Sequence, residues 1–381
     1  MIELKPIYEE ALRACAPGAL IARVKDGSYP RAVVAIGKCA GALLDGFGEH
    51  DAAFVAIPRG YPRPRSAPER IVFEGGHPHM THDSFVAGKA LLDFTHAHDE
   101  ITFLISGGGS ACVEWAVEPF SERELIDVNA RLIRSGIPIG EINCVRKHLS
   151  AIKGGRLAAR LRRSVTLVYS DVSTGALADV ASGPSVPDPT TREQAHAILR
   201  RIGVTIDVND ETPKTIATSE MHLIADNGTL RSAAANVVRE RGGTPVMWDA
   251  QIESNVADAA AALANAAKKL QRDEVLIAGG EPTVIERGEG KGGRCSELAV
   301  RFAVHAHSMR VRALFGSSDG VDGNSGAAAV LVDLPVAFDR EFAERELARS
   351  NSMAVVGAIG STIPSHATGN NLRDLYLLAC S

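Results

Sequence analysis

The stretch "ITFLISGGGSA" (residues 101–111) joins a short apolar run to three consecutive glycines. A run without polar alternation is typical of a strand that is buried on both faces of a mostly parallel sheet. Glycines directly after such a strand mark the turn that ends it. Comparable apolar runs recur along the chain with helical patterns between them, so the stretch predicts a layered α/β protein.

The alternation of apolar runs and helical patterns defines the expected elements. Strands are expected at Ala32–Ile36, Ala53–Ile57, Ile71–Phe73, Ile101–Ile105, Val165–Tyr169, Thr244–Trp248, Glu274–Ala278, Ala313–Phe315 and Ala329–Val332. Helices are expected at Asp83–Ala97, Ser121–Ser135, Arg192–Ile202, Leu230–Arg241 and Val256–Leu270. A chain of 381 residues exceeds one ordinary core. We therefore predict two α/β domains, over residues 1–245 and 246–381, divided near the "RERGGTPV" turn (239–246).

Composition and charge exclude several classes of partner. The chain carries 41 basic and 46 acidic side chains, and a net charge of −5 creates no field that attracts nucleic acid or a membrane. No apolar run reaches membrane-spanning length, and the start "MIELKPIYEEALRACAPGALIARV" is expected as a helix, not a signal peptide. Six cysteines without a CxxC pair indicate reduced thiols. We expect a cytoplasmic protein with small-molecule partners, and the sequence also allows a homodimer.

Two glycine-containing turns follow expected strands in the N-terminal domain. In "LISGGGSA" (104–111) bare backbone can approach a phosphate and its N–H groups can converge on it; the alternative is a plain strand-to-helix turn. The spacing matches neither GxGxxG nor the Walker P-loop. "AIGKCAG" (35–41) carries Lys38, which at the carboxyl end of a parallel strand can reach a ligand in a cleft.

The segment "AGGEPTVIERGEGKGGRCSELA" (278–299) is the richest in the C-terminal domain. A strand ends in Gly-Gly-Glu, a hairpin-like arm is expected next, and "GKGGR" opens a helix near Cys295. Glycines with Lys291 and Arg294 at a helix N-terminus predict an anion site; the alternative is an exposed flexible hairpin.

Acidic side chains follow two further strands. Asp171 comes after the run that ends at Tyr169, and Asp319 lies in "GSSDGVDG" (316–323). Carboxylates that can hold Mg²⁺, together with cations at glycine turns, suit phosphoryl transfer. The histidines of "GHPHMTH" (76–82) are expected to form a polar loop rather than a metal site.

Taken together, several motifs resemble those of class II glycerate kinases, also called glycerate 2-kinases. They are "ISGGGSA", "EINCVRKHLSAIKGGRLA", "SDV…ASGPSVPDPTT", "GGEPTV…GKGGR…ELA" and "SDGVDG", in that order and across nearly the whole chain. The resemblance implies transfer of phosphate from ATP, with Mg²⁺, to the 2-hydroxyl of D-glycerate or a closely related short hydroxy acid. It also implies a Rossmann-like N-terminal domain with a glycine-loop phosphate site, a second α/β domain, and an active site in the cleft between them.

Position by position, the resemblance implies the site residues. They are Lys38, Asp171 and Arg294 as catalytic groups, Ser106, Gly107, Gly108, Gly109, Ser110, Lys291, Gly292 and Gly293 for the nucleotide, Asn143, Arg146, Lys153 and Glu281 for the substrate, and Asp171 and Asp319 for the metal. If one helix carries positions 143, 146, 150 and 153, their spacing places them on one face.

The chain also departs from the family pattern. Gly175 and Gly326 stand where relatives usually have aspartates, and Cys295-Ser296 replaces an Asn-Gln pair. By the same position-by-position resemblance, Asp179 is not a family carboxylate, and we expect it to be a surface acid. These departures leave two alternatives open: a relative with altered specificity, or one that binds nucleotide or sugar acid without turnover. A hydroxypyruvate reductase is disfavoured because no GxGxxG fingerprint is present.

Overall fold

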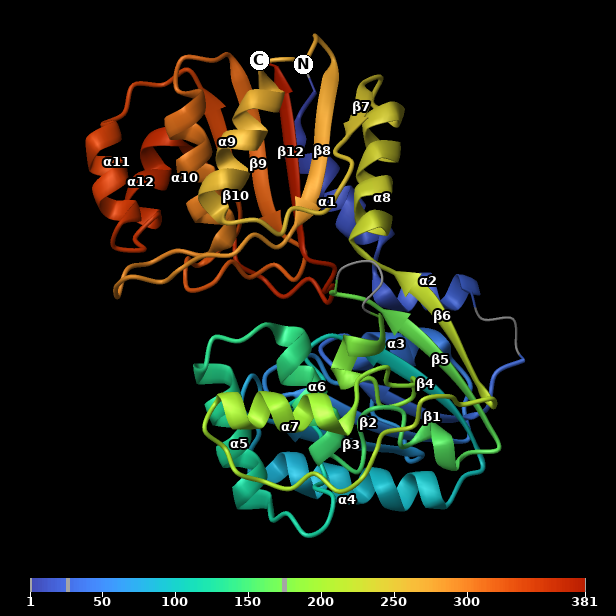
Figure 1. The fold of residues 1–381 in the computed structure, drawn as a ribbon. Helices are drawn as coiled ribbons and strands as arrows, with labels where there is room; N and C mark the ends of the chain where they lie inside the picture. The colour runs from blue at the N-terminus through green and yellow to red at the C-terminus, as the bar shows by residue number, and fades with distance from the viewer. Residues whose placement is uncertain (1, 25–27, 173–176, 381) are drawn as a thin grey trace. The chain divides into compact units, whose positions relative to one another are not determined.

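The computed structural model describes residues 2–24, 28–172 and 177–380. The chain divides into two compact units, shown in Figure 1. The N-terminal unit consists of residues 17–224, and the C-terminal unit consists of residues 1–16 together with 225–381. The expected division at 245/246 falls inside a strand of the C-terminal unit, and the first helix of the chain also belongs to that unit. Contacts distant in sequence therefore set the division.

The N-terminal unit is built around one six-stranded sheet. Its elements are α2 (Pro17–Val24), β1 (Ala32–Ile36), α3 (Ala40–Phe47), β2 (Ala52–Pro58), β3 (Arg70–Gly75), α4 (His82–His96), β4 (Glu100–Ser106), α5 (Glu122–Arg134), α6 (Ile139–Leu149), the 3₁₀ turns Ala158–Arg160 and Leu177–Ser182, β5 (Arg163–Tyr169), α7 (Arg192–Arg201) and β6 (Ser219–Ala225). The strand order is β3-β2-β1-β4-β5-β6, and β1 to β5 pair in parallel. This is the doubly wound Rossmann order, whose direction reverses between β1 and β4.

Helices cover both faces of this sheet, as the apolar strands predict. Every residue of β1 is buried, and its side chains alternate between the faces. Val34 and Ile36 join a cluster with Leu91 and Phe94 of α4, while α3 also packs against β1 (Figure 1). The carboxyl ends of β1, β4 and β5 are thereby held side by side at one edge of the sheet.

The C-terminal unit has a second six-stranded sheet of mixed direction. Its elements are α1 (Leu4–Ala14), α8 (Asn227–Glu240), β7 (Thr244–Met247), α9 (Val256–Ala267), β8 (Glu274–Gly280), α10 (Arg294–Ala306), β9 (Val311–Ser317), β10 (Ala327–Leu334), α11 (Arg340–Leu347), α12 (Met353–Ile359), β11 (Gly360–Pro364) and β12 (Asp374–Cys380). The order is β11-β10-β9-β12-β8-β7; β7 and β8 are parallel, and the other pairs are antiparallel.

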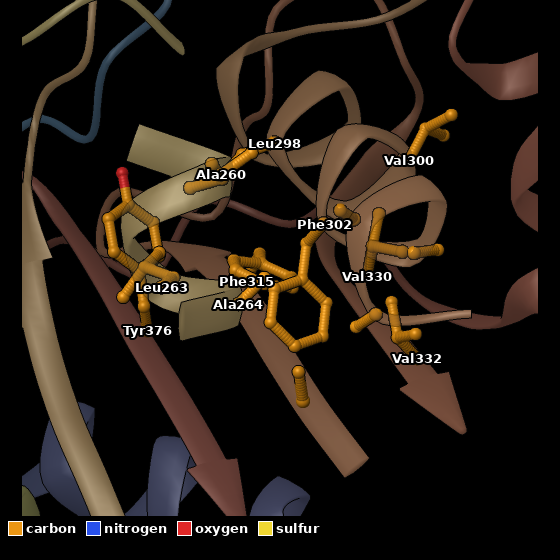
Figure 2. Packing of buried hydrophobic residues seen from close by; sticks show 14 of the residues in the cluster. Ala260, Leu263, Ala264, Leu298, Val300, Phe302, Phe315, Val330, Val332 and Tyr376 are labelled. Atoms are coloured by element: carbon orange, nitrogen blue, oxygen red, sulfur yellow. The ribbon is translucent and has the colours of Figure 1, made fainter. Parts of the chain in front are cut away.

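The core of this unit lies between the sheet and the helices α9 and α10. Figure 2 shows Leu263 of α9 and Phe302 of α10 beside Phe315 of β9 and Tyr376 of β12. The Phe315 ring centroid lies 5.3 Å from that of Phe302 and 5.7 Å from that of Tyr376. On the sheet's other side Tyr8 of α1 donates its hydroxyl to the carbonyl of Ser317 at 2.6 Å. None of the described helices is long and apolar enough to cross a membrane.

Candidate active site

The glycine loop begins where β4 ends, between the ends of β1 and β5. Residues 107–112 form turns, and no helix starts before α5, so the loop is not a helix N-terminus. A Cβ on Gly107 would lie 1.6 Å from a carboxylate oxygen of Asp171. A Cβ on Gly108, which has a φ of +78°, would lie 2.8 Å from Cγ of Lys38. Bare backbone is therefore what allows Lys38 and Asp171 to pack against the loop.

Lys38 is placed by two hydrogen bonds that join its turn to the end of β4. The Lys38 backbone N–H donates to the Gly107 carbonyl at 2.9 Å, and the Cys39 N–H donates to Ser106 Oγ at 3.0 Å. The Lys38 ammonium lies 5.5 Å from the centroid of the Tyr61 ring. These bonds bring the Lys38 turn and the glycine loop together at the switch point between β1 and β4. In folds of this type ligands bind at that point, outside the carboxyl ends of the strands.

Hydroxyl and amide groups connect the loop to α6. Ser110 Oγ lies 2.8 Å from Ser182 Oγ, and the Ser182 hydroxyl donates to Asn143 Oδ1 at 3.1 Å. Within the loop, Gly108 and Ser110 are partly exposed, whereas Ser106 is buried and its hydroxyl accepts a hydrogen bond from the Cys39 N–H. The structure thus brings two predicted residues, Ser110 and Asn143, into one network. Ser182 was not singled out from the sequence, although its "ASGP" motif was part of the resemblance.

Arg146 of α6 presents its guanidinium from a largely buried position. Its Nε donates to Asn129 Oδ1 at 2.8 Å, and among the described residues its two terminal nitrogens have no hydrogen-bond partner. Burial lowers the pKa of Arg146, and the Glu114 carboxylate opposes that effect. The pKa of His77 is lowered first by burial, then by the charge of Lys38, and then by that of Arg146. The side chains of His77, Lys38 and Arg146 therefore lie in one region of the N-terminal unit.

The expectation that one helix face carries positions 143, 146, 150 and 153 is wrong for the last two. Helix α6 ends at Leu149, Ser150 has an extended backbone, and its hydroxyl accepts from the Lys153 N–H at 3.2 Å. The Lys153 ammonium is bonded to the Glu114 carboxylate and donates to the Val113 carbonyl at 3.3 Å, with both charged side chains 1% exposed. Lys153 thus supports the backbone after the glycine loop, which argues against direct contact with substrate.

Asp179 is not the surface acid that the resemblance suggested. Its carboxylate is half-buried and accepts a hydrogen bond from the Lys147 ammonium at 2.7 Å. The same ammonium also donates to Asp188 Oδ1 at 3.3 Å. The acid at position 179 therefore serves as the ion-pair partner of Lys147 and not as a solvent-facing charge. Gly175, the other departure in this segment, lies outside the described residues.

Arg294, the first residue of α10, anchors the predicted residues of the C-terminal unit. Its Nη1 lies 2.7 Å from Glu281 Oε1, and its Nε donates to Asp374 Oδ2 at 3.3 Å. Burial acts to lower the pKa of Arg294, but the carboxylates of Asp374 and Glu281 outweigh it and raise that pKa above its ordinary value. Glu281 also lies 3.8 Å from Nε of Arg373. Neither Asp374 nor Arg373 was expected from the sequence to belong to the site.

The segment between β8 and α10 forms no hairpin; within it Thr283 makes a single bridge to Asn255. Its backbone donors already have partners: the N–H groups of Lys291, Gly292 and Gly293 donate to Asn351, Asn324 and Ser296 side chains. The Asp322 carboxylate accepts from the first turn of α10, from the N–H groups of Cys295 at 2.8 Å and Ser296 at 2.9 Å. The nucleotide role expected for Lys291, Gly292 and Gly293 therefore remains a prediction from the resemblance.

The two expected metal ligands lie in different units. Asp171 follows β5 in the N-terminal unit, and Asp319 follows β9 in the C-terminal unit. Asp319 Oδ1 accepts from the Ser317 hydroxyl at 2.7 Å and from the Val321 N–H at 3.0 Å. Among residues 2–24, 28–172 and 177–380, no three His, Cys, Asp or Glu side chains gather as a metal site would require. That the site lies in a cleft between the domains also remains a prediction.

The chain is similar to known proteins along most of its length. Residues 3–217 match the family described as "Domain of unknown function (DUF4147)", and residues 274–374 match the MOFRL family. The D-glycerate 2-kinase of Thermotoga maritima is 31% identical over 329 residues, which is 80% of this chain and 79% of that protein. The glycerate 2-kinase of Sulfurisphaera tokodaii is 33% identical over 330 residues, 82% of this chain and 80% of that protein.

A solved structure is similar along the whole chain. The crystal structure of the Thermotoga maritima glycerate kinase matches with a TM-score of 0.89 at 27% identity, and the match covers 99% of this chain and 98% of that one. The chain thus has the same fold as the Thermotoga maritima glycerate kinase.

Proposed function

Because this chain belongs to the glycerate 2-kinase family, we propose that it transfers the terminal phosphoryl group of ATP to the 2-hydroxyl of D-glycerate or a closely related short hydroxy acid. The glycerate kinases among its relatives are phosphotransferases that act on an alcohol group. ATP as donor and the 2-hydroxyl as acceptor come from this kinship and from the resemblance in sequence motifs.

One observation carries the proposal: Lys38 and Asp171 pack against the glycine loop at the switch point of a Rossmann sheet. Phosphoryl transfer requires cations on the phosphate oxygens, a carboxylate for Mg²⁺ and a backbone cradle that positions the nucleotide. The N-terminal unit holds one group of each kind within reach of a single loop. We assign Lys38 to the transferred phosphoryl group and the exposed part of the loop, Gly108 and Ser110, to the nucleotide phosphates.

Arg146 fits the carboxylate of the acceptor. Its Nε is held by Asn129, so its two terminal nitrogens form the edge that can bind a carboxylate with two parallel hydrogen bonds. Asn143 lies one turn earlier on α6 and is already tied to the glycine loop through Ser182. The two residues would orient the substrate so that its 2-hydroxyl faces the phosphate site.

Asp171 is suited to Mg²⁺. Magnesium in kinases is commonly held by one or two carboxylates, with phosphate oxygens and water completing the octahedron, and the Asp171 carboxylate lies directly against Gly107 of the loop. Bound there, the metal would neutralise charge on the phosphates. Asp319 is the proposed second carboxylate, and Arg294, held in its charged form by Asp374 and Glu281, is the proposed second cation.

The alternative of a hydroxypyruvate reductase has no support in the described residues. β1 is followed by Gly37-Lys38-Cys39 and not by the GxGxxG turn of dinucleotide-binding domains. The departures at Gly175 and Gly326 instead favour altered acceptor specificity as the second candidate.

The proposal is tested by incubating the purified protein with ATP, Mg²⁺ and D-glycerate, and identifying the product by NMR. We expect phosphate at the 2-position. Turnover of longer aldonates in preference to glycerate would establish altered specificity. Nucleotide binding by calorimetry without turnover of any short hydroxy acid would overturn the kinase assignment.

A further inference from the structure

Asp374 lies at the edge of the second sheet where the predicted residues of the C-terminal unit leave their strands. It is the first residue of β12, and in the register of the sheet it pairs with Gly280 on β8 and with Ser317 on β9. Glu281 directly follows the first of these partners, and Asp319 follows the second by two residues. The central strand of the sheet therefore begins with a carboxylate between two proposed site residues.

The carboxylate of Asp374 is almost fully buried, with 1% of its side chain exposed, and its partners include Arg294 and Tyr376. Arg294 donates to it from Nε at 3.3 Å and from Nη2 at 3.5 Å, and the Tyr376 hydroxyl donates to Oδ2 at 3.0 Å. A buried charge is tolerated only when it is paired and hydrogen-bonded. The ring of Tyr376 belongs to the apolar cluster of Figure 2, so its hydroxyl comes from a rigid support.

The backbone around Asp374 is held as firmly as its side chain. The buried amide of Asn227 donates to the carbonyls of Leu372 at 2.8 Å and Asp374 at 3.0 Å. Between them, Arg373 has a φ of +64°, a left-handed conformation that costs energy in a residue with a side chain. Its carbonyl accepts from the Ser318 N–H at 3.1 Å. Backbone strain of this kind persists only where the surroundings hold it, and it clusters at functional sites.

We propose that Asp374 is a positioning residue for the phosphoryl-transfer reaction: it holds Arg294 by the Nε and Nη2 edge so that the opposite nitrogen, Nη1, points to the substrate side. This rests on the proposed function. An arginine side chain has many rotamers, and fixing one edge of its rigid fork removes most of them before the substrate arrives. Glu281, which is 39% exposed, lies 2.7 Å from Nη1.

The first test is Asp374→Asn, which keeps the shape and removes the charge. We expect kcat to fall by about tenfold or more, the scale for loss of one positioned electrostatic group, while calorimetry shows ATP affinity within about twofold of the parent protein. Wild-type kcat in this variant would overturn the proposal.

The second test is chemical rescue, which a merely structural role would not affect. Added guanidinium should bind in the space left by Arg294→Ala, restore part of its activity and raise its melting temperature. In the double variant Arg294→Ala/Asp374→Asn both effects should disappear, because the carboxylate that holds the cation is gone. Equal rescue of the two variants, or no effect of guanidinium on the single variant, would overturn the proposal.

Asp322→Asn in the Arg294→Ala background is the matched control. Asp322 is also buried and caps the same helix, where its carboxylate accepts from the backbone N–H groups of Cys295 and Ser296. This control should melt earlier and still be rescued. The shift in melting temperature caused by guanidinium does not depend on catalysis. An inactive wild-type protein would therefore contradict the proposed function, while this shift would still show whether Asp374 holds the cation.

Discussion

Lys38 and Asp171 approach one glycine loop from the two strands that flank it. Lys38 follows β1 and Asp171 follows β5, while the loop itself follows β4 between them. The two side chains lie against successive glycines, Asp171 against Gly107 and Lys38 against Gly108. A cation and a carboxylate are thus held at a single backbone turn, which is the arrangement that phosphoryl transfer requires.

Gly107→Ala tests this arrangement directly. The new Cβ would lie 1.6 Å from the Asp171 carboxylate, so Asp171 must move. We expect kcat to fall by about tenfold or more, because the displaced carboxylate can no longer hold Mg²⁺ against the phosphates. The control is Gly140→Ala in α6, where an added Cβ meets no atom within 4 Å. That variant should keep its kcat and gain about 0.5–1 kcal/mol of stability. Equal kcat values in the two variants would contradict the arrangement.

Arg146→Lys separates substrate binding from nucleotide binding. Lysine keeps the charge but cannot make two parallel bonds to a carboxylate. We expect KM for glycerate to rise about tenfold, equivalent to about 1.4 kcal/mol, with KM for ATP nearly unchanged in steady-state assays. Asn129→Ala should produce a smaller rise, since it frees Nε without removing the guanidinium. A parallel rise of both KM values in Arg146→Lys would show that this residue does not select the acceptor.

The buried pair of Lys153 and Glu114 should matter for stability. Removing one partner leaves an uncompensated buried charge, so Lys153→Met is expected to lower the free energy of unfolding by about 3–5 kcal/mol in urea titrations. Replacing both residues by apolar ones of similar size should recover much of that loss. The exposed pair of Lys89 and Asp93 is the control, and Lys89→Met should cost less than about 1 kcal/mol. A Lys153→Met variant as stable as this control would contradict the role of the buried pair.

His77 provides a pH-dependent readout of the same region. Burial, then Lys38, then Arg146 lower its pKa, so the native state binds fewer protons at this site than the unfolded chain. The His77 contribution to stability is therefore present above the ordinary histidine pKa and is lost as the pH falls through the lowered value. In Lys38→Met one of the opposing charges disappears, and NMR titration of the His77 imidazole should show a higher pKa. An unchanged pKa would mean that Lys38 does not lie near His77.

Much of the fold could be predicted because short sequence patterns mark the buried strands. Every strand expected from an apolar run overlaps an observed strand, since burial on both sheet faces leaves a continuous apolar signature. The strands β6, β11 and β12 were not expected. β6 (Ser219–Ala225) is largely exposed, and β11 (Gly360–Pro364) is short and bounded by glycine and proline, so neither has that signature. β12 (Asp374–Cys380) is buried in all but its last residue and has the signature, although it was not among the expected strands.

The candidate site was only partly predictable for the same reason. The turns that carry Lys38, the glycine loop and Asp171 each follow a recognisable strand, and in a parallel sheet the ends of such strands meet at one edge. No local pattern indicated that Glu114 would form an ion pair with Lys153, or that the Asp322 carboxylate would accept from the Cys295 N–H in the first turn of α10. These partners are 39 and 27 residues apart in the chain.

The sequence by itself determined the layered α/β class, the strands that pass through the core and the residues placed at their ends, because burial and backbone geometry are encoded within a few residues. Only the tertiary structure decided which carboxylate meets which cation. Lys153 became the ion-pair partner of Glu114, and Asp179 became that of Lys147. Asp374 came to hold Arg294 because β12 lies between β8 and β9. Charge pairing depends on distances across the fold, and those distances exist only once the chain has packed.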